Sequence, residues 1–192
     1  MVLKRKRKKI LLTSLYLAIL AILGYIYINP PLQLQNMPFP TELHPLVKER
    51  SDQLVQQAAE KGIVVVITDG FRSSEEQDRL FEKGRSTEGN IVTYARGGES
   101  LHNYGLAIDF ALRTATQEVI WDMQFDGNQN GVADWEEVVE LAKVLGFDWG
   151  GDWARFKDYP HLQMDFGLTL ADLQNGKRPP ESSLMVDSNP GD

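Results

Sequence analysis

A strict alternation between residues 105 and 112 constrains the fold of this chain more than any other feature. Every second residue is large and apolar, namely Leu106, Ile108, Phe110 and Leu112. The residues between them are small except for one carboxylate, namely Gly105, Ala107, Asp109 and Ala111. Because successive side chains of a β-strand point to opposite faces, this pattern predicts a strand with one face in the core. The small residues of the other face leave room for a bound group beside Asp109.

Residues 161–166 alternate in the same way, which predicts a second strand of this kind. One face carries His161, Gln163 and Asp165, and the other carries Leu162, Met164 and Phe166. If the two strands pair in antiparallel fashion, Asp109 and His161 face one cavity. His102 then joins them from the loop before the first strand.

Two imidazoles and one carboxylate are typical of a zinc site that keeps a fourth position open for water. Zinc lowers the pKa of such a water, and a nearby carboxylate can accept its proton as a general base. Asp158, three residues before His161, is the candidate for that base. The alternative is that His102 and His161 are ordinary polar residues of the core or surface. The combination of four suitable groups in a chain with three histidines disfavours it.

Arg72 is a candidate for stabilising negative charge. It follows the apolar run Ile63–Thr68 through Asp69 and Gly70, so the sequence places a cation at the end of a predicted buried strand. A fixed cation there can stabilise the oxyanion of a tetrahedral intermediate. The alternative is a surface arginine paired with Glu75 or Glu76, which would contribute little.

These segments resemble the VanY-like D-alanyl-D-alanine carboxypeptidase family of zinc peptidases, and within it the L-alanyl-D-glutamate endopeptidases of cell walls and phage endolysins. The likeness covers about residues 41–170. Four ordered motifs carry it: Gly70-Phe-Arg-Ser73 with Gln77, Ser100-x-His102-x-x-Gly105-x-Ala107-x-Asp109, Trp149-Gly-Gly-Asp-Trp153, and Asp158-x-Pro-His161. The last form is typical of the endopeptidase branch, whereas the carboxypeptidases tend to carry Glu-x-Trp-His.

The resemblance implies a role for each matching residue. It implies that His102, Asp109 and His161 bind Zn²⁺, that Asp158 is the catalytic base, and that Arg72 stabilises the oxyanion. It also implies substrate contacts for a further set of residues: Gln77, Ser100, Trp149 and Asp152.

The implied function is a zinc metallopeptidase that cleaves the L-alanyl-D-glutamate bond of peptidoglycan stem peptides. A D-alanyl-D-alanine carboxypeptidase is the first alternative. A non-catalytic, zinc-stabilised wall-binding module is the second, because the hedgehog signalling domain is similar to the same family. The presence of Asp158 argues against such a module, since a binding protein needs no base. A membrane-tethered scaffold would need no metal at all.

The first thirty residues predict a membrane anchor. Residues 4–9 are all basic, and residues 10–28 contain no charge. An uncharged run of this length can cross a bilayer as a helix, and the preceding cations predict a cytoplasmic N-terminus. The rest of the chain would then face the cell wall. A cleaved signal peptide is the alternative, which the long run and the absence of a small-x-small site in residues 29–31 disfavour.

The remaining pattern predicts one folded domain between two extended segments. The expected organisation is a basic tail (1–9), a transmembrane span (10–28), a proline-rich linker (29–40), a zinc peptidase domain (41–178) and a disordered tail (179–192). Helices are expected at 41–61, 73–83 and 134–145, and strands at 63–68, 91–94, 105–112, 118–121 and 161–166. This order predicts an α+β fold, a small antiparallel sheet with flanking helices, similar to D-Ala-D-Ala peptidases.

Composition limits the partners of this domain. All 27 acidic residues but only 14 of the 20 basic residues follow residue 30, so the predicted outer part carries a net charge of −13. A strongly acidic domain is not expected to bind nucleic acid. The chain has no cysteine, which excludes disulfides and a lipid-modified cysteine.

Residues 126–137 predict a second metal site, for Ca²⁺. Side-chain oxygens occupy positions 1, 3, 5, 9 and 12 of a twelve-residue loop, with glycine at position 6, as in an EF-hand. The five candidate ligands are Asp126, Asn128, Asn130, Asp134 and Glu137. The alternative is a turn rich in asparagine and glycine, with Asp134 capping the helix that follows.

Overall fold

The computed structural model describes residues 39–180, and the structural statements below concern this part of the chain. The predicted basic tail, the span 10–28 and nearly all of the linker lie outside the described residues. Most of the predicted C-terminal tail does too. Within residues 39–180, no helix is both long and apolar enough to cross a bilayer.

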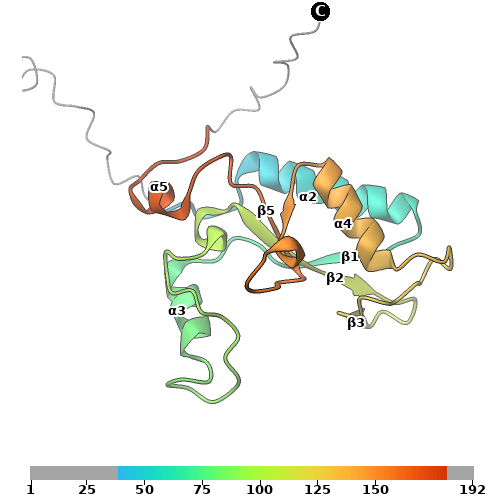
Figure 1. Ribbon diagram of the computed structural model, residues 1–192, viewed down its shortest axis with the longest axis horizontal. Helices are drawn as coiled ribbons and strands as arrows, with labels where there is room; N and C mark the ends of the chain where they lie inside the picture. The colour runs from blue at the N-terminus through green and yellow to red at the C-terminus, as the bar shows by residue number, and fades with distance from the viewer. Residues whose placement is uncertain (1–38, 181–192) are drawn as a thin grey trace, which may run out of the picture. The chain divides into compact units, whose positions relative to one another are not determined.

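A five-stranded antiparallel sheet organises the described domain (Figure 1). Strand β2 (Ala107–Arg113) lies at its centre, between β1 (Val65–Asp69) and β5 (His161–Gln163). Strand β4 (Asp148–Trp149) pairs with β5, and the short β3 (Val119–Ile120) pairs with the end of β2. The sheet therefore places the two alternating segments of the sequence side by side, as predicted.

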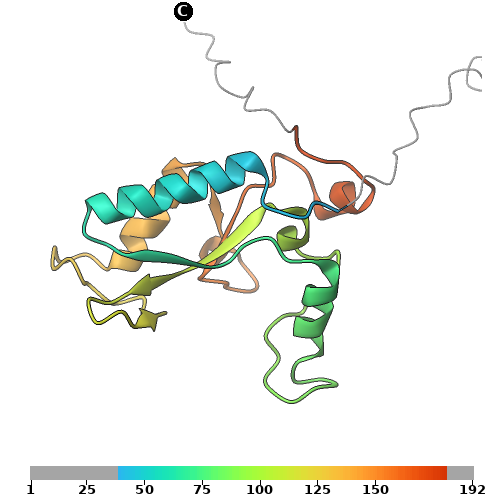
Figure 2. The same ribbon diagram turned by 180° about the vertical axis from the view of Figure 1, so that it is seen from behind.

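Two long helices pack against this sheet and against each other. They are α2 (Pro45–Glu60) and α4 (Asp134–Val144), and Figure 2 shows α2 running along the sheet. Helix α3 (Ser74–Glu82) follows β1, and the short α5 (Leu170–Gln174) lies near the end of the described chain. The expected α+β architecture, a small antiparallel sheet with flanking helices, is confirmed.

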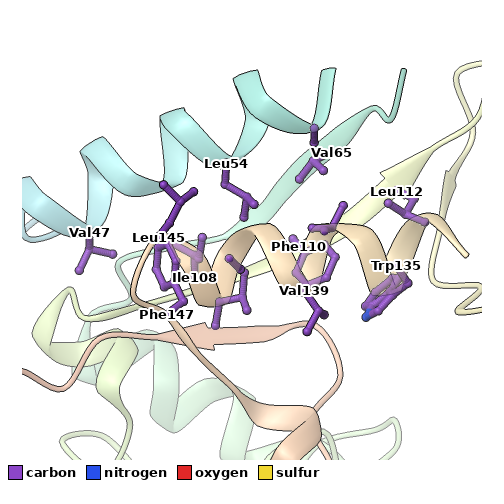
Figure 3. Close-up of a cluster of buried hydrophobic side chains, with 14 of the residues drawn as sticks. Val47, Leu54, Val65, Ile108, Phe110, Leu112, Trp135, Val139, Leu145 and Phe147 are labelled. Atoms are coloured by element: carbon purple, nitrogen blue, oxygen red, sulfur yellow. The ribbon is translucent and has the colours of Figure 1, made fainter. Parts of the chain in front are cut away.

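The core lies between the sheet and these two helices (Figure 3). The four large apolar residues of the alternating segment all enter it, each no more than 1% exposed: Leu106, Ile108, Phe110 and Leu112. The Phe110 ring packs on Trp135 of α4, with 4.4 Å between the ring centroids. Full burial of a side chain of this size contributes about 1.5–3 kcal/mol, so this alternating segment contributes strongly to the stability of the domain.

The structure corrects two predicted strands. The strand expected at 161–166 ends at Gln163, and Phe166 has a positive φ of 55°. Residues 91–94 form no strand, and Ile91, Val92 and Tyr94 are exposed by 46%, 56% and 71%. A short apolar run indicates a strand only when a sheet edge is available to pair with it. Here the segment lies in the long connection between α3 and the turn η1 (Leu101–Tyr104), away from the sheet (Figure 1).

Helix α3 begins with the predicted capping box. Ser73 Oγ accepts a hydrogen bond from the Glu76 amide, and the Glu76 carboxylate accepts one from the Ser73 amide. We expect Ser73→Ala to lower the free energy of unfolding by about 1 kcal/mol, because an amide at the helix start loses its partner. Urea unfolding measures the change. Ser86→Ala, at an exposed site outside any helix, should stay within about 0.5 kcal/mol of the wild type, and equal effects of the two changes would contradict the prediction.

Candidate active site

A cleft of about 620 Å³ opens beside the paired ends of β2 and β5. Its walls include the end of β1, the turn η1, the loop around Thr93 and the segment from Trp153 to His161. Four of the predicted catalytic and metal-binding residues line it together with Arg72: His102, Asp109, Asp158 and His161. Residues that are far apart in the sequence are therefore brought to one cavity.

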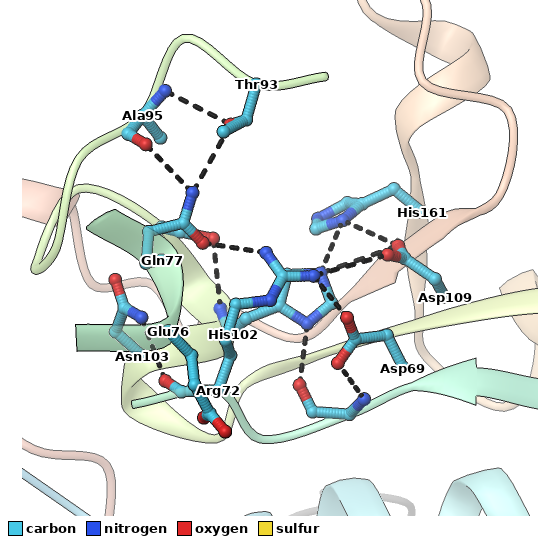
Figure 4. Close-up of polar contacts among 12 residues, drawn as sticks. Asp69, Arg72, Glu76, Gln77, Thr93, Ala95, His102, Asn103, Asp109 and His161 are labelled. Carbon is cyan, nitrogen blue, oxygen red and sulfur yellow. Dashed lines mark hydrogen bonds and ion pairs between the residues drawn. The ribbon is translucent and has the colours of Figure 1, made fainter. Parts of the chain in front are cut away.

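Three side chains form a compact cluster in this cleft (Figure 4). Asp109 and His161 are directly opposite each other in the β2–β5 pair, and His102 comes from η1. Asp109 Oδ1 lies 3.4 Å from both His102 Nε2 and His161 Nδ1, and these two nitrogens are 3.2 Å apart. The arrangement predicted from the alternation is thus present in the structure.

The hydrogen bonds of the two imidazoles fix where their lone pairs point. His102 Nδ1 lies 2.7 Å from the carbonyl oxygen of Gly70, and His161 Nε2 lies 3.1 Å from Gln163 Oε1. Both partners are acceptors, so these outer nitrogens carry the protons when the rings are neutral. The inner nitrogens then direct two lone pairs at each other and at Asp109.

This cluster of acceptors fits a cation. Asp109 Oδ1 is buried and has no hydrogen-bond partner, and the three ligand atoms are close enough to bind one ion. Burial raises the pKa of Asp109, but the two imidazoles lower it more strongly, so the carboxylate is ionised at neutral pH. Metal-bound histidines typically donate their other ring N–H to a carbonyl or carboxylate acceptor, as these two rings do. His102, Asp109 and His161 can therefore hold a metal ion.

Two glycines make the close packing around the cluster possible. Gly105 ends η1 with φ +67°, and a Cβ there would collide with the carbonyl oxygen of Glu42. Gly150 lies against Asp158, and a Cβ there would collide with the Asp158 carbonyl oxygen. Residues with side chains would therefore displace the turn that carries His102 or the segment that carries Asp158.

Asp158 lines the same cleft but is not one of the three clustered ligands. Burial raises its pKa, which the neighbouring His161 partly offsets. A carboxylate whose proton affinity is raised by burial is a better proton acceptor than an exposed one.

Arg72 points toward the cluster, not to the surface acids. Its Nη2 donates to Asp69 Oδ2 at 2.5 Å and lies 3.9 Å from Asp109 Oδ2, while Nη1 donates to Gln77 Oε1 at 2.7 Å. The alternative pairing with Glu75 or Glu76 is therefore wrong. Asp69, which was missed from the sequence, sits three residues before Arg72 at the end of β1. An acidic residue three positions before Arg72 is the sequence signal that identifies Asp69 as its partner.

Gln77 lies behind Arg72. It is 1% exposed, and its side-chain nitrogen donates to Thr93 Oγ1 at 3.3 Å and to the Ala95 carbonyl at 2.8 Å. A substrate contact was expected for this residue, but the structure gives it a different set of partners. Gln77 fastens the loop at Thr93 and Ala95 to the guanidinium of Arg72 (Figure 4).

We expect Gln77→Leu to lower kcat/KM by about tenfold, because Arg72 and the loop both lose a buried partner worth roughly 1–3 kcal/mol. Gln77→Glu is the matched variant. It keeps an oxygen for Arg72 but places a second oxygen against the Ala95 carbonyl, so it should detach the loop while Arg72 stays in place. Steady-state kinetics, read beside the melting temperature, separates the two effects. Wild-type kinetics in Gln77→Leu would contradict the positioning role.

The remaining predicted substrate contacts divide into two groups. Ser100 lines the cleft, where its Oγ accepts a hydrogen bond from the His102 amide at 3.4 Å. Trp149 and Asp152 do not line it. Asp152 pairs with Lys143 at 3.0 Å, and the Trp149 indole donates to the Tyr159 carbonyl at 2.7 Å.

The other tryptophan of the same motif, Trp153, is the one that lines the cleft. Its ring centroid is 5.1 Å from that of His161. The motif Trp149-Gly-Gly-Asp-Trp153 does not by itself show which of its two tryptophans faces the cleft.

The loop 126–137 gives the calcium prediction no support. The amide nitrogens of Asn128 and Asn130 donate to Glu137 Oε2, and Lys61 donates to Glu137 Oε1. In an EF-hand loop, the glutamate at position 12 binds the ion through both carboxylate oxygens. Here both oxygens of Glu137 already accept hydrogen bonds from these three side chains. Among residues 39–180, His102, Asp109 and His161 form the one cluster of three suited to a metal.

The alternative for this loop also needs correction. Asp134 does not cap α4, because the N-cap is Ala133 and Asp134 Oδ2 accepts a hydrogen bond from the Gly127 amide. The carboxylate closes the loop onto the helix instead.

Comparison with known proteins decides the family. A family model described as D-alanyl-D-alanine carboxypeptidase matches residues 93–164. The peptidoglycan L-alanyl-D-glutamate endopeptidase CwlK of Bacillus subtilis (strain 168) is 68% identical over 131 residues, which are 68% of this chain and 78% of CwlK. The chain belongs to this family of peptidases. It is therefore an enzyme, and the cleft with its metal-binding cluster is the place where the family's chemistry would occur.

One more distant relative and one solved structure are also similar to this chain. The L-alanyl-D-glutamate peptidase of Listeria phage A118 is 32% identical over 119 residues, which are 62% of this chain and 37% of the phage protein. The solved structure of the Serratia marcescens L-Ala D-Glu endopeptidase ChiX matches at 23% identity with a TM-score of 0.42, over 73% of this chain and 86% of ChiX. The family assignment rests on the CwlK match.

Proposed function

We propose that this chain is a membrane-anchored, zinc-dependent L-alanyl-D-glutamate endopeptidase that cleaves the stem peptides of peptidoglycan. The observation that carries the proposal is the cluster of His102, Asp109 and His161, whose inner lone pairs and unpaired carboxylate oxygen suit a cation. Two imidazoles and one carboxylate are a donor set that zinc favours in hydrolases. The relationship to CwlK supports the choice of bond.

Four residues in or behind the wall of the cleft have parts in the proposed reaction. Zinc, when bound, acts as a Lewis acid that polarises the scissile carbonyl and activates a water. Asp158 takes the proton of the attacking water and returns it to the leaving amine of D-glutamate. Arg72 stabilises the negative charge that develops on the carbonyl oxygen. Asp69 and Gln77 hold the guanidinium in the orientation that this requires.

The charges of the cleft favour an endopeptidase over a carboxypeptidase. A carboxypeptidase needs a cation for the terminal carboxylate of its substrate. Among the described residues that line the cleft, Arg72 is the one lysine or arginine, and Asp69 already pairs with it. The Asp158-x-Pro-His161 form points the same way. An internal bond whose D-glutamate is amidated to D-isoglutamine makes no demand for a second cation.

Digestion of purified peptidoglycan by the zinc-loaded full-length chain in mild detergent tests the proposal. Mass spectrometry of the products should find new D-glutamate amino ends. Released D-alanine would instead establish the carboxypeptidase alternative. Absence of any product, with one equivalent of zinc bound, would favour the wall-binding module.

The membrane anchor has a separate test, because it depends on residues 10–28 alone. Cells that express the full-length chain are fractionated, and the membranes are washed with alkaline carbonate. The proposal expects the intact chain to remain in the washed membranes, since an uncharged run of this length can span a bilayer. A shortened, released chain would support the cleaved signal peptide instead.

A further inference from the structure

Two exposed aromatic side chains face each other at the rim of the catalytic cleft. Tyr94 comes from the connection between α3 and η1, and Phe156 comes from the segment before β5. Their ring centroids are 6.3 Å apart, and the rings meet nearly edge to face, at 82°. Both residues line the same cavity as His102 and Asp158, although they are 71% and 54% exposed.

Interactions on both sides of Tyr94 hold this rim in place. Arg85 donates to the Thr93 carbonyl and lies over the Tyr94 ring, 5.5 Å from its centroid. On the other side, Gln77 donates to the Ala95 carbonyl. Tyr94 is therefore held by the contacts of its neighbours. Exposed apolar side chains gathered at one edge of a groove mark a binding site more often than chance exposure does.

The charge of the cleft indicates what the aromatic pair can bind. The cleft lining contains four carboxylates, namely Asp69, Glu99, Asp109 and Asp158. Its one described cation, Arg72, is already paired with Asp69. Among the described lining residues, no lysine or arginine is left free to pair with an anionic ligand. A neutral ring with apolar C–H faces suits two aromatic walls, which offer a large rigid surface with a polar hydroxyl at the edge of Tyr94.

The chemistry of the substrate places such a ring next to the bond that is cut. In peptidoglycan, L-alanine is joined by an amide to the lactyl group of an amino sugar, which removes the charge of that carboxyl group. One extended residue spans about 3.5 Å, so L-alanine and the lactyl group together place the sugar ring roughly 7 Å from the scissile bond. On the other side of the bond, D-glutamate and the diamino acid carry ionisable groups. The aromatic rim therefore matches the sugar side of the substrate.

We propose that Tyr94 and Phe156 form a subsite for the amino sugar that bears the stem peptide. This rests on the proposed function and adds that the enzyme recognises stem peptides still attached to the glycan. The aromatic pair then acts as a specificity determinant, because a free peptide cannot fill this end of the cleft.

The test compares two substrates with the full-length, zinc-loaded chain. One is a disaccharide-linked stem peptide, and the other is the same peptide N-acetylated in place of the sugar, so that both carry an amide at L-alanine. The wild type should show at least about a tenfold higher kcat/KM for the linked substrate. Tyr94→Ala and Phe156→Ala should lower the ratio of the two values toward one, and Tyr94→Phe should retain most of it.

Trp121→Ala is the matched control, because Trp121 is 56% exposed and does not line the cleft. It should leave the ratio as in the wild type. A wild-type ratio near one, or an equal fall on both substrates in the two alanine variants, would overturn the subsite.

A binding measurement separates failure of the subsite from failure of the proposed function. If neither substrate is cut, isothermal titration of a muramoyl-L-alanine amide into the chain still reports on the sugar subsite. Binding that weakens in Tyr94→Ala but not in Trp121→Ala would support the subsite without the reaction. Absence of binding to the wild type would overturn it.

Discussion

Asp158→Asn is expected to lower kcat on peptidoglycan stem peptides by about 10²–10⁴-fold, the range typical of a general base. The amide has nearly the shape of the carboxylate but cannot accept a proton at neutral pH. Asp158 lies in the cleft beside the metal-binding cluster without belonging to it. The variant should therefore fold and bind zinc like the wild type while losing the chemical step.

Three measurements on one preparation check this. Product formation gives kcat, elemental analysis gives bound zinc, and circular dichroism gives the melting temperature. Asp52→Asn is the control, because Asp52 is an exposed carboxylate on α2 that pairs with Lys48 alone. It should change kcat little. A decrease of less than tenfold in Asp158→Asn would contradict the role of base, and so would loss of the zinc.

Removal of the metal is expected to abolish activity and to lower the melting temperature by roughly 10 °C. A ligand present at 1,000 times its Kd stabilises the folded state by about 4 kcal/mol. For a chain of this size, each kcal/mol shifts the melting temperature by roughly 2–4 °C. The physical cause is electrostatic repulsion within the cluster. Without a cation, the lone pairs of His102 and His161 lie close to each other and to the Asp109 carboxylate.

The choice of chelator distinguishes the predicted zinc site from the predicted calcium site. A zinc-selective chelator should produce the whole shift, and a calcium-selective chelator should produce none. Asp109→Asn should melt at the temperature of the metal-free wild type and should not respond to the zinc-selective chelator. Asp126→Asn, in the loop once expected to bind calcium, should still respond. A shift with the calcium-selective chelator would show that this loop holds an ion after all.

Local patterns in the sequence predicted the parts of the fold that depend on neighbouring residues. Side-chain alternation assigned the two faces of β2, and the pair Ser73 and Glu76 located the start of α3. The metal-binding cluster was also predictable. Once two alternating strands pair, the residues on their shared face must meet, and His102 is a few residues away along the chain.

Contacts between distant segments were decided by the tertiary structure. The run 91–94 has the composition of a strand, but it pairs with no strand of the described sheet and forms an exposed loop that carries Tyr94. Gln77 turned inward to join Arg72 to that loop. Trp153 faces the cleft whereas Trp149 does not.

The sequence by itself therefore predicted most of the elements, the three residues suited to a metal and the family, because these depend on periodicity, spacing and residue chemistry. Only the tertiary structure decided which partner each polar side chain takes and which aromatic residues line the cleft. The physical reason is that alternation assigns a side chain to a face, whereas its partner depends on which other segments pack against that face.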